Sequence, residues 1–344
     1  MEELKRTEIG SIGEFGLIDK IAAGAMIQHQ TTLKGIGDDA AVIGTTAGKV
    51  MLVSTDMLLE GIHFDLSYMP LVHLGYKAVT VNVSDIAAMN GIPKQITVSL
   101  GLSNRMSVEA VEAIYEGIYA AAKDYKLDVI GGDTTASRAG LMISMTIIGE
   151  ASEDQVVYRS GAKNSDILCV TGDVGSAYMG LQILEREKEV FKVDPNMQPQ
   201  LDKYAAIVGR QLRPKARMDV IYELMDLNMV PTAMIDISDG LASEIFHLCK
   251  QSQLGACIYE DKLPISEQTF ETAAEFSMDP NTAALNGGED YELLFTIRQE
   301  DFEKIEHHHD ITTIGYMHPP ESGKVMVTTN KTTVALTAQG WIHF

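Results

Sequence analysis

Short apolar runs alternate with stretches of helical periodicity in the first half of the chain. Runs at 39–43, 50–55, 94–101 and 141–150 are rich in branched or apolar residues and predict strands. Over 107–124 the apolar residues recur every three or four positions, which predicts a helix. Strands and helices therefore interleave in this half.

The segment 73–90 carries two conflicting signals. Its motif KAVTVNV has the branched residues that favour a strand. Its length is helical, however, and the Gly91-Ile92-Pro93 that follows is typical of a helix end. We therefore expect a helix.

A polar stretch at 150–165, rich in turn residues, precedes a second half with the same alternation. We therefore expect an α/β to α+β fold in two domains, 1–151 and 152–344. The elements expected in the second domain are a strand at 166–172, helices at 176–188 and 203–210, a strand at 232–236 and a helix at 238–253.

Composition and charge narrow the class of protein. With 344 residues, of which 45% are hydrophobic and 22% charged, the chain is long enough for two globular cores. The net charge of −21 argues against nucleic acid and against an anionic membrane surface, because both attract Lys and Arg. The chain has no apolar run of about 18 residues and no secretory h-region. Cys169, Cys249 and Cys257 stand singly, without the spacing of a metal site or a disulfide framework, so we expect a cytoplasmic protein.

The run VMLVSTD at 50–56 is a predicted strand that finishes in two hydroxyls and a carboxylate. Other aspartates also stand at predicted element ends or beside small residues, and each alone would suit a cap or a turn. Ligand sites of α/β proteins gather at the carboxyl ends of strands, so we expect these aspartates to meet in one cleft. Gly131 and Gly132 would let the backbone approach a ligand there. The six aspartates are Asp39, Asp56, Asp85, Asp133, Asp236 and Asp239.

A cleft with that many carboxylates needs neutralising cations. Two like charges about 4 Å apart repel by roughly 4 kcal/mol at an effective dielectric near 20. Mg²⁺ prefers oxygen ligands, such as these carboxylates and the hydroxyls of Ser54 and Thr55, and substrate phosphates usually complete its shell. This pattern predicts phosphate chemistry through metal bridges. Calcium storage is the non-enzymatic alternative, although the EF-hand pattern is missing, as are the P-loop, the dinucleotide fingerprint and the kinase HRD and DFG motifs.

Two further patterns are less specific. TGDVGSAYMG at 171–180 predicts a strand, a turn and a helix, which would either offer backbone N–H groups to an anion or form only a tight turn. HHHD at 307–310 predicts a solvated turn, because three adjacent imidazoles cannot easily face one ion.

Taken in order, the motifs of the chain resemble those of the thiamine-monophosphate kinase family. They run from about Gly13 to Phe295 and are GEFGLIDKI, GIGDDAAVI, STDMLLEGIHF, YKAVTVNVSDIAAMNGIP, VIGGDTT, RSGAK, DISDGLASEI and NGGEDYELLFT. The resemblance implies the fold of aminoimidazole ribonucleotide synthase, with an N-terminal α/β domain that dimerises through its sheet and a C-terminal α+β domain. It also implies direct transfer of the γ-phosphoryl group of ATP onto thiamine monophosphate by a homodimer, assisted by several Mg²⁺ and without a phosphoenzyme.

The resemblance implies roles for individual residues as well. Positions that touch ATP in the family match Gly132, Arg159 and Ser238. Positions that touch the acceptor match His63, Glu289 and Trp341. No covalent or general-base residue is expected, since the acceptor phosphate is already anionic at neutral pH. The metal-binding positions of the family match Asp39, Ser54, Thr55, Asp56, Asp85, Asp133, Asp236 and Asp239.

Other families with this fold are the enzymatic alternatives. The hydrogenase-maturation dehydratase needs a C-terminal cysteine, whereas this chain ends in WIHF. Selenide-activating relatives need a reactive residue near the N-terminus, whereas the first cysteine here is Cys169. The purine-pathway synthase stays open, and a non-catalytic cation- or nucleotide-binding protein is the alternative of a different class.

Overall fold

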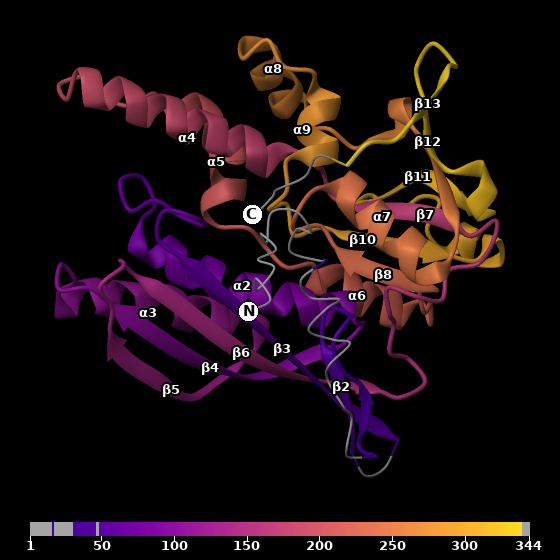
Figure 1. The fold of residues 1–344 in the computed structure, drawn as a ribbon, viewed down its shortest axis with the longest axis horizontal. Helices are drawn as coiled ribbons and strands as arrows, with labels where there is room; N and C mark the ends of the chain where they lie inside the picture. Colours follow the sequence, from indigo (N-terminus) through magenta and orange to yellow (C-terminus); the bar gives the residue numbers. More distant parts are fainter. Residues whose placement is uncertain (1–15, 17–29, 46–47, 339–344) are drawn as a thin grey trace, which may run out of the picture.

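The computed structural model describes residue 16 and residues 30–45 and 48–338, which form two sheets and the helices that cover them. Figure 1 shows the first sheet, in indigo and magenta, beside the second, with α2 (Leu71–Ala88) at the junction. The first sheet ends with β6 (Met142–Ser152) and the second begins with β7 (Ile167–Thr171). We call the two sheets with their helices the N-terminal and the C-terminal domain.

The N-terminal domain is a six-stranded sheet in the order β1-β2-β3-β6-β4-β5. β4 and β5 are parallel, and the other neighbours are antiparallel. Every second side chain of β6 is buried, which is the pattern of a sheet with one covered face. The bounds are β1 (Thr32–Lys34), β2 (Ala41–Gly44), β3 (Lys49–Leu59), β4 (Ile92–Leu102), β5 (Asp128–Ala136) and β6 (Met142–Ser152).

Helix α2 packs on the covered face, and α3 (Val108–Tyr125) packs on α2. The helix predicted for 73–90 is thus confirmed, and its strand-like composition has a simple cause. α2 is buried on nearly all sides between the sheet and the C-terminal domain, so it has no wide polar stripe. The two helices cross at glycines: a Cβ on Gly75 would lie 1.9 Å from the carbonyl oxygen of Ile114. The backbones therefore touch directly at this crossing.

The opposite face of the N-terminal sheet is accessible in the described part of a single chain. Along β3, the side chains of Met51, Val53, Thr55 and Met57 point to this face and are half-buried or exposed. The side chain of Met57 is large and apolar, and the residue is 49% exposed. Apolar and polar groups are therefore mixed on an open sheet face.

The C-terminal domain is a seven-stranded sheet in the order β13-β12-β9-β11-β7-β10-β8. β9 and β12 are parallel, and the other neighbours are antiparallel. The strands are β7 (Ile167–Thr171), β8 (Ala233–Asp236), β9 (Gly255–Tyr259), β10 (Leu293–Ile297), β11 (Ile311–His318), β12 (Lys324–Val327) and β13 (Thr333–Ala335). The helices are α4 (Ser176–Val193), α5 (Ala205–Leu212), α6 (Met218–Asp226), α7 (Leu241–Ser252), α8 (Glu267–Glu275) and α9 (Pro280–Asn286).

The core divides at the second sheet, because alternate side chains of each strand point to opposite faces. Leu168 and Val170 of β7 pack in a cluster with residues of α7. Cys169, between them, belongs to a larger cluster that also contains residues of α4, α5, α6, α2 and the N-terminal sheet. The two domains therefore share one continuous apolar core on the α2 side.

Two predicted strand ends are wrong. β3 continues past Asp56 to Leu59 and pairs with β6 along its whole length. The apolar run LDVI before Gly131, Gly132 and Asp133 likewise predicts a strand that ends in Gly-Gly-Asp, whereas β5 continues to Ala136. Polar residues often mark the end of a strand, but a strand accepts them where it borders a cavity or an exposed edge. Of the six aspartates, only Asp236 is the last residue of a strand.

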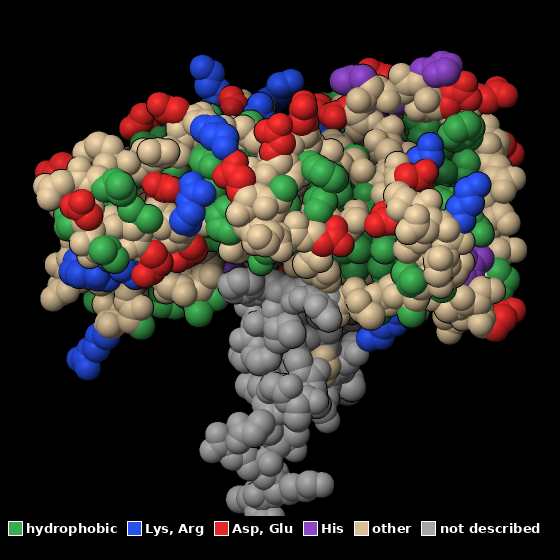
Figure 2. Space-filling view, turned by 90° about the horizontal axis from the view of Figure 1, so that it is seen from above, with side chains coloured by type: hydrophobic (Ala, Val, Ile, Leu, Met, Phe, Trp, Pro, Cys, Tyr) green, Lys and Arg blue, Asp and Glu red, His purple; other side chains and the backbone are tan. Residues whose placement is uncertain are grey.

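Figure 2 shows how charged side chains are arranged on one face of the molecule. On the face seen in Figure 2, acidic side chains are scattered among lysines and arginines and form no single patch. A search of the described residues for helices with the length and apolar character to cross a bilayer finds none.

Candidate active site

A cavity of about 1040 Å³ is lined by residues of both domains. The N-terminal domain contributes β3, the turn that follows it and α2. The C-terminal domain contributes the loops after β8 and before β10, together with residues of α4 and α7. The site is therefore assembled by the packing of one domain on the other.

Three carboxylates from distant parts of the chain meet in this cavity. Asp39, Asp85 and Asp236 place carboxylate oxygens within 4.8 Å of one another. Asp39 lies in the loop before β2, Asp85 lies in α2, and Asp236 ends β8. The Ser84 hydroxyl, also on α2, donates to Asp236 Oδ2 at 2.6 Å and ties the two domains together.

Strand β3 adds Asp56 and Ser54 to the group. The Ser54 hydroxyl donates to the carboxylate of Asp85, which lies beside the carboxylate of Asp56. Asp56 Oδ2 is buried without a hydrogen-bond partner among the described residues. Thr55 borders the cavity, but its hydroxyl donates to the Met145 carbonyl at 2.7 Å. Because side chains of a strand alternate between its faces, the Thr55 hydroxyl points away from the side chains of Ser54 and Asp56, and its role as a metal ligand stays a prediction.

Burial and mutual repulsion raise the pKa values of three of these carboxyl groups, those of Asp56, Asp85 and Asp236. Burial is the largest cause for the raised pKa of Asp56 and for the strongly raised pKa of Asp85, where repulsion by Asp56 adds to it. Burial, with repulsion by Asp39, raises the pKa of Asp236 to about 8. The group therefore favours protons or cations over free negative charge.

Arg159 is a cation in direct contact with this group. It forms a bidentate ion pair with Asp39, with Nε 2.9 Å from Oδ2 and Nη2 2.7 Å from Oδ1. Ser238 and Asp239 follow β8 and line the cavity. The Asp239 N–H donates to the buried carboxylate of Glu244 at 2.9 Å, which fastens this loop to the first turn of α7.

Two of the three predicted acceptor contacts also line the cavity. His63 lies in the turn after β3, where the Leu59 N–H donates to its Nδ1 at 3.0 Å and thereby places the ring proton on Nε2. Glu289 Oε2 accepts from Lys77 Nζ at 2.9 Å and from Gln211 Nε2 at 2.6 Å. Trp341 lies outside the described residues.

Asp133 and Gly132 are not brought to the cavity of their own chain. Both lie on β5, the exposed edge strand, where Asp133 pairs with Ser99 of β4. A Cβ on Gly132 would lie 1.7 Å from the carbonyl oxygen of Val98. Because the β4 backbone approaches so closely, a side chain at position 132 would clash with it, so the fold itself requires glycine there.

The N-terminus of α4 binds an anion of the protein itself. Asp290 accepts from the Gly175 N–H at 2.7 Å and from the Ala177 N–H at 3.2 Å. Burial raises the pKa of Asp290 to about 7, against the opposing effects of Arg210 and these two N–H groups. The backbone N–H groups of the motif at 171–180 are thus used within the fold.

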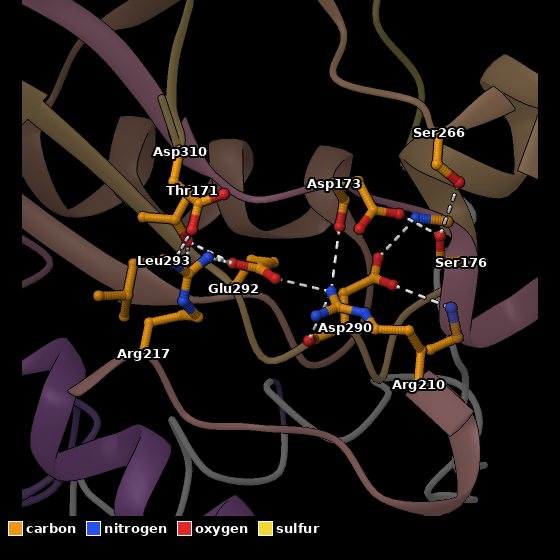
Figure 3. A network of polar contacts seen from close by, with 12 residues as sticks. Thr171, Asp173, Ser176, Arg210, Arg217, Ser266, Asp290, Glu292, Leu293 and Asp310 are labelled. Carbon is orange, nitrogen blue, oxygen red and sulfur yellow. Dashed lines mark hydrogen bonds and ion pairs between the residues drawn. The ribbon is translucent and has the colours of Figure 1, made fainter. Parts of the chain in front are cut away.

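Figure 3 shows the ionic network behind this loop, in which two arginines flank one carboxylate. The carboxylate of Glu292 is almost fully buried and forms two ion pairs. Its Oε1 lies 2.7 Å from Arg210 Nη2, and its Oε2 lies 2.5 Å from Arg217 Nη1. Thr171 donates to the same carboxylate at 2.5 Å. Arg217 also pairs with Asp310, so the network anchors the segment 289–292 from the side of β7 and β11.

The last residue of the HHHD motif, Asp310, belongs to this ionic network through its pair with Arg217. The side chain of His307 is 92% exposed, as a solvated turn predicts. His308, however, is largely buried, contacts Glu223 at 2.6 Å through Nε2 and accepts the Asp310 N–H at Nδ1. Within the described ranges, the group of Asp39, Asp85 and Asp236 is the one found with three side chains placed to hold a metal.

Sequence analysis missed several residues that support the site, among them Lys77, Gln211 and Glu244. Lys77 precedes Ser84 by seven residues, which is two helical turns, so both lie on one face of α2. That spacing was the available signal for Lys77. Glu244, five residues after Asp239, had the appearance of an ordinary acidic residue in the first turn of a helix.

Two family models together match most of the chain. The AIR synthase related protein, N-terminal domain, matches residues 37–151, and the AIR synthase related protein, C-terminal domain, matches residues 164–327. The thiamine-monophosphate kinase of Bacillus subtilis (strain 168) is 37% identical over 343 residues, which cover 96% of this chain and 99% of that protein. The thiamine-monophosphate kinase of Aquifex aeolicus (strain VF5) is 36% identical over 333 residues, with coverages of 97% and 98%.

Solved structures agree with these similarities. The structure described as AaThiL complexed with AMPPCP and TMP matches with a TM-score of 0.84 and 33% identity, and covers 98% of this chain and 99% of its own. Hydrogenase maturation protein HypE in complex with ATP matches with a TM-score of 0.69 at 18% identity, which shows a common fold alone. The chain therefore belongs to the thiamine-monophosphate kinase family and is a kinase built from two AIR synthase related domains.

Proposed function

We propose that the protein transfers the γ-phosphoryl group of ATP directly to thiamine monophosphate, giving thiamine diphosphate and ADP. The observation that carries this proposal is the meeting of Asp39, Asp56, Asp85 and Asp236 in one cavity lined by both domains. It is supported by similarity to thiamine-monophosphate kinases over nearly the whole chain. A related structure was described in complex with AMPPCP and TMP.

The donor set of the cavity fits several Mg²⁺ ions. Carboxylates and hydroxyls are the hard oxygen ligands that this ion prefers, and the buried Asp56 Oδ2 has no hydrogen-bond partner among the described residues. Bound Mg²⁺ would neutralise the charge between the two phosphate groups and hold them in line. The residues that would hold the ions are Asp39, Ser54, Asp56, Asp85, Asp236 and Asp239.

The other side chains of the cavity bind and orient the two substrates. Arg159 and Ser238 present a guanidinium and a hydroxyl, which suit the phosphates of ATP. His63 offers a donor through Nε2, and Glu289 offers an acceptor, to thiamine monophosphate. No side chain needs to remove a proton, because the attacking phosphate oxygen is already anionic. The bond from the γ-phosphorus to the ADP oxygen breaks as the bond to the acceptor oxygen forms.

We also propose that the protein acts as a homodimer through the open face of the N-terminal sheet. Asp133 shares that face with Met57, since β5, β4, β6 and β3 pair in register through Ser99 and Ser144. A second copy seated there would bury Met57 and the other apolar side chains of β3. Gly132 and Asp133 would then contact ATP and its metal ions at the interface.

The test is to incubate the purified protein with ATP, MgCl₂ and thiamine monophosphate and to separate the products. We expect thiamine diphosphate and ADP in equal amounts, and neither product after chelation of divalent ions. Thiamine in place of its monophosphate should give no thiamine diphosphate, because the acceptor atom is a phosphate oxygen. Intact ATP, or ADP and inorganic phosphate without thiamine diphosphate, would overturn the proposal.

A further inference from the structure

Lys77 carries a positive charge into the interior of the protein. The residue is 0% exposed, although a lone buried ammonium is strongly disfavoured. Its Nζ donates to the Gln211 carbonyl at 3.2 Å and to Glu289 Oε2 at 2.9 Å. Both partners belong to the C-terminal domain, whereas Lys77 lies on α2 of the N-terminal domain. The charge is therefore stabilised only when the two domains are packed.

Both side-chain donors that contact Glu289 bind the same carboxylate oxygen, Oε2. Lys77 Nζ and Gln211 Nε2, at 2.6 Å, both donate to Oε2. Within the described part of the chain, neither a hydrogen bond nor an ion pair is found at Oε1. The Glu289 side chain is 26% exposed and lines the cavity. Oε1 is thus the atom that can accept a hydrogen bond from a bound molecule.

The backbone holds Glu289 in the same place. Its φ of 59° lies in the left-handed region, which is uncommon outside glycine. The Glu289 N–H donates to the Ser238 carbonyl at 2.7 Å, and the Tyr291 N–H donates to the Ile237 carbonyl at 2.9 Å. Glu289 is therefore fixed beside the loop that bears Ser238 and Asp239, close to where the two substrates would meet.

We propose that Lys77 is a positioning residue, which orients the Glu289 carboxylate so that Oε1 accepts a hydrogen bond from the acceptor substrate. This inference rests on the proposed function and adds the orientation in which thiamine monophosphate binds. A carboxylate repels a phosphate, so the part of thiamine monophosphate that meets Glu289 is its organic end, which carries an amino group and a cationic ring. The phosphate of the acceptor then points towards the aspartates and their cations.

The test compares the kinetics of Lys77→Met and Glu289→Gln with those of the wild type. Loss of one charge-assisted hydrogen bond should raise the KM for thiamine monophosphate about tenfold or more in either variant. We expect kcat and the KM for ATP to stay within about twofold, since neither residue meets the transferred phosphoryl group. Lys192→Met is the matched control, because Lys192 pairs with Glu189 on the surface of α4, and it should behave as the wild type.

A double-mutant cycle separates positioning from a merely structural role. Because Lys77 acts through Glu289, adding Lys77→Met to Glu289→Gln should raise the KM for the acceptor by no more than about twofold. With the wild type, a thiamine monophosphate analogue that has oxygen in place of the pyrimidine amino group should have a higher KM than thiamine monophosphate. In both variants, the KM values of the two compounds should be similar. If Lys77→Met does not fold, Gln211→Met removes the other donor to Oε2 and should raise the same KM.

Additive effects of Lys77→Met and Glu289→Gln would overturn the inference while the proposed function stands. An equal rise in the KM for ATP, or a loss of kcat alone, would do the same. Absence of any turnover of thiamine monophosphate by the wild type would overturn the proposed function itself, and the inference with it.

Discussion

At the scale of single residues, the cavity is built from carboxyl groups that repel one another. Asp39 pairs with Arg159, Asp85 accepts a hydrogen bond from the Ser54 hydroxyl, and Asp236 accepts one from the Ser84 hydroxyl. Burial removes the water that would screen these charges, so hydrogen bonds alone balance them only in part. The proposed cations would supply the remaining charge.

Asp56→Asn and Asp239→Asn should each lower turnover of thiamine monophosphate by about 10²-fold or more while the fold is retained. The amide removes the negative charge that would hold Mg²⁺ but keeps the shape of the side chain. Initial rates at saturating Mg²⁺, with circular dichroism to verify folding, provide the measurement. Asp154→Asn, at an exposed position away from the cavity, is the matched control. Near-normal rates in Asp56→Asn or Asp239→Asn would contradict the metal assignment.

The stability of the protein should fall as pH rises from 6 to 8 when divalent ions are chelated. The pKa of Asp236 is raised from 3.8 to about 8, so its contribution is fully present below about pH 4 and is lost as the pH rises through about 8. Mg²⁺ should reduce this fall, because the cation favours the ionised form in the folded protein. Urea denaturation at both pH values, with and without Mg²⁺, measures the effect. The raised pKa of Asp290 also lowers the stability as the pH rises. Because Asp290 does not line the cavity, Mg²⁺ should not change the part of the fall that comes from Asp290.

An equal fall with and without Mg²⁺ would argue against cation binding at Asp236. The variant Asp236→Asn separates this group from the others. It should show a smaller fall between pH 6 and 8 than the wild type, because the amide does not titrate.

At the scale of elements, helix α2 connects the parts of the site. It carries Lys77, Ser84 and Asp85, which contact Glu289, Asp236 and the β3 side chains. Its position is set by the glycine crossing with α3 and by packing on both domains. A shift of α2 would therefore move several groups of the cavity together.

Gly75→Ala should lower the free energy of unfolding by about 2–3 kcal/mol, because the new methyl group meets the Ile114 carbonyl oxygen. Turnover should fall as well, since α2 carries Asp85. Gly209→Ala is the matched control: it lies within α5 with nothing within 4 Å of the new Cβ. We expect the control to gain up to about 1 kcal/mol from helix propensity. Urea denaturation compares the two, and equal effects would contradict the close crossing.

The buried ionic network gives a second prediction at this scale. Glu292→Gln should lower the free energy of unfolding by about 3 kcal/mol or more, because Arg210 and Arg217 lose a buried counter-charge. Glu300→Gln breaks a surface pair with Arg298 and should change the stability by less than about 0.5 kcal/mol. Thermal or urea denaturation measures both, and a near-neutral Glu292→Gln would show that this network is not needed for folding.

At the scale of the whole molecule, the cavity exists because two domains share a core. The larger apolar cluster joins the N-terminal sheet to the C-terminal helices through α2. Loops from both domains then meet around the aspartates. The open face of the N-terminal sheet lies on the side away from α2, and there we propose the second copy of the chain.

Met57→Glu should weaken this proposed homodimer by about tenfold or more, because an unpaired charge would be buried at the interface. Val108→Glu is the matched control, since Val108 is 70% exposed on α3, on the covered side of the sheet. Sedimentation equilibrium measures the dissociation constant of each variant. A monomeric wild type, or a dimer that tolerates Met57→Glu, would contradict an interface on this face.

Much of the fold followed from local patterns. The periodicity over 107–124 and the apolar runs at 94–101 and 141–150 correspond to α3, β4 and β6 within a few residues. Even for α2, with its branched residues, the length of the segment and the Gly91-Ile92-Pro93 stop predict a helix. Periodicity and breakers act on neighbouring residues, so a single chain displays them directly.

The sequence by itself determined the kinds of elements, the alternation in two halves and the expectation of an acidic cleft, because these depend on local preference and residue chemistry. Only the tertiary structure decided which side chains meet. It turned Thr55 away from Ser54 and Asp56, left Asp133 on an edge strand and brought Lys77 to Glu289. The reason is physical: strand length, register and domain packing set these distances, and they depend on contacts between residues far apart in the chain.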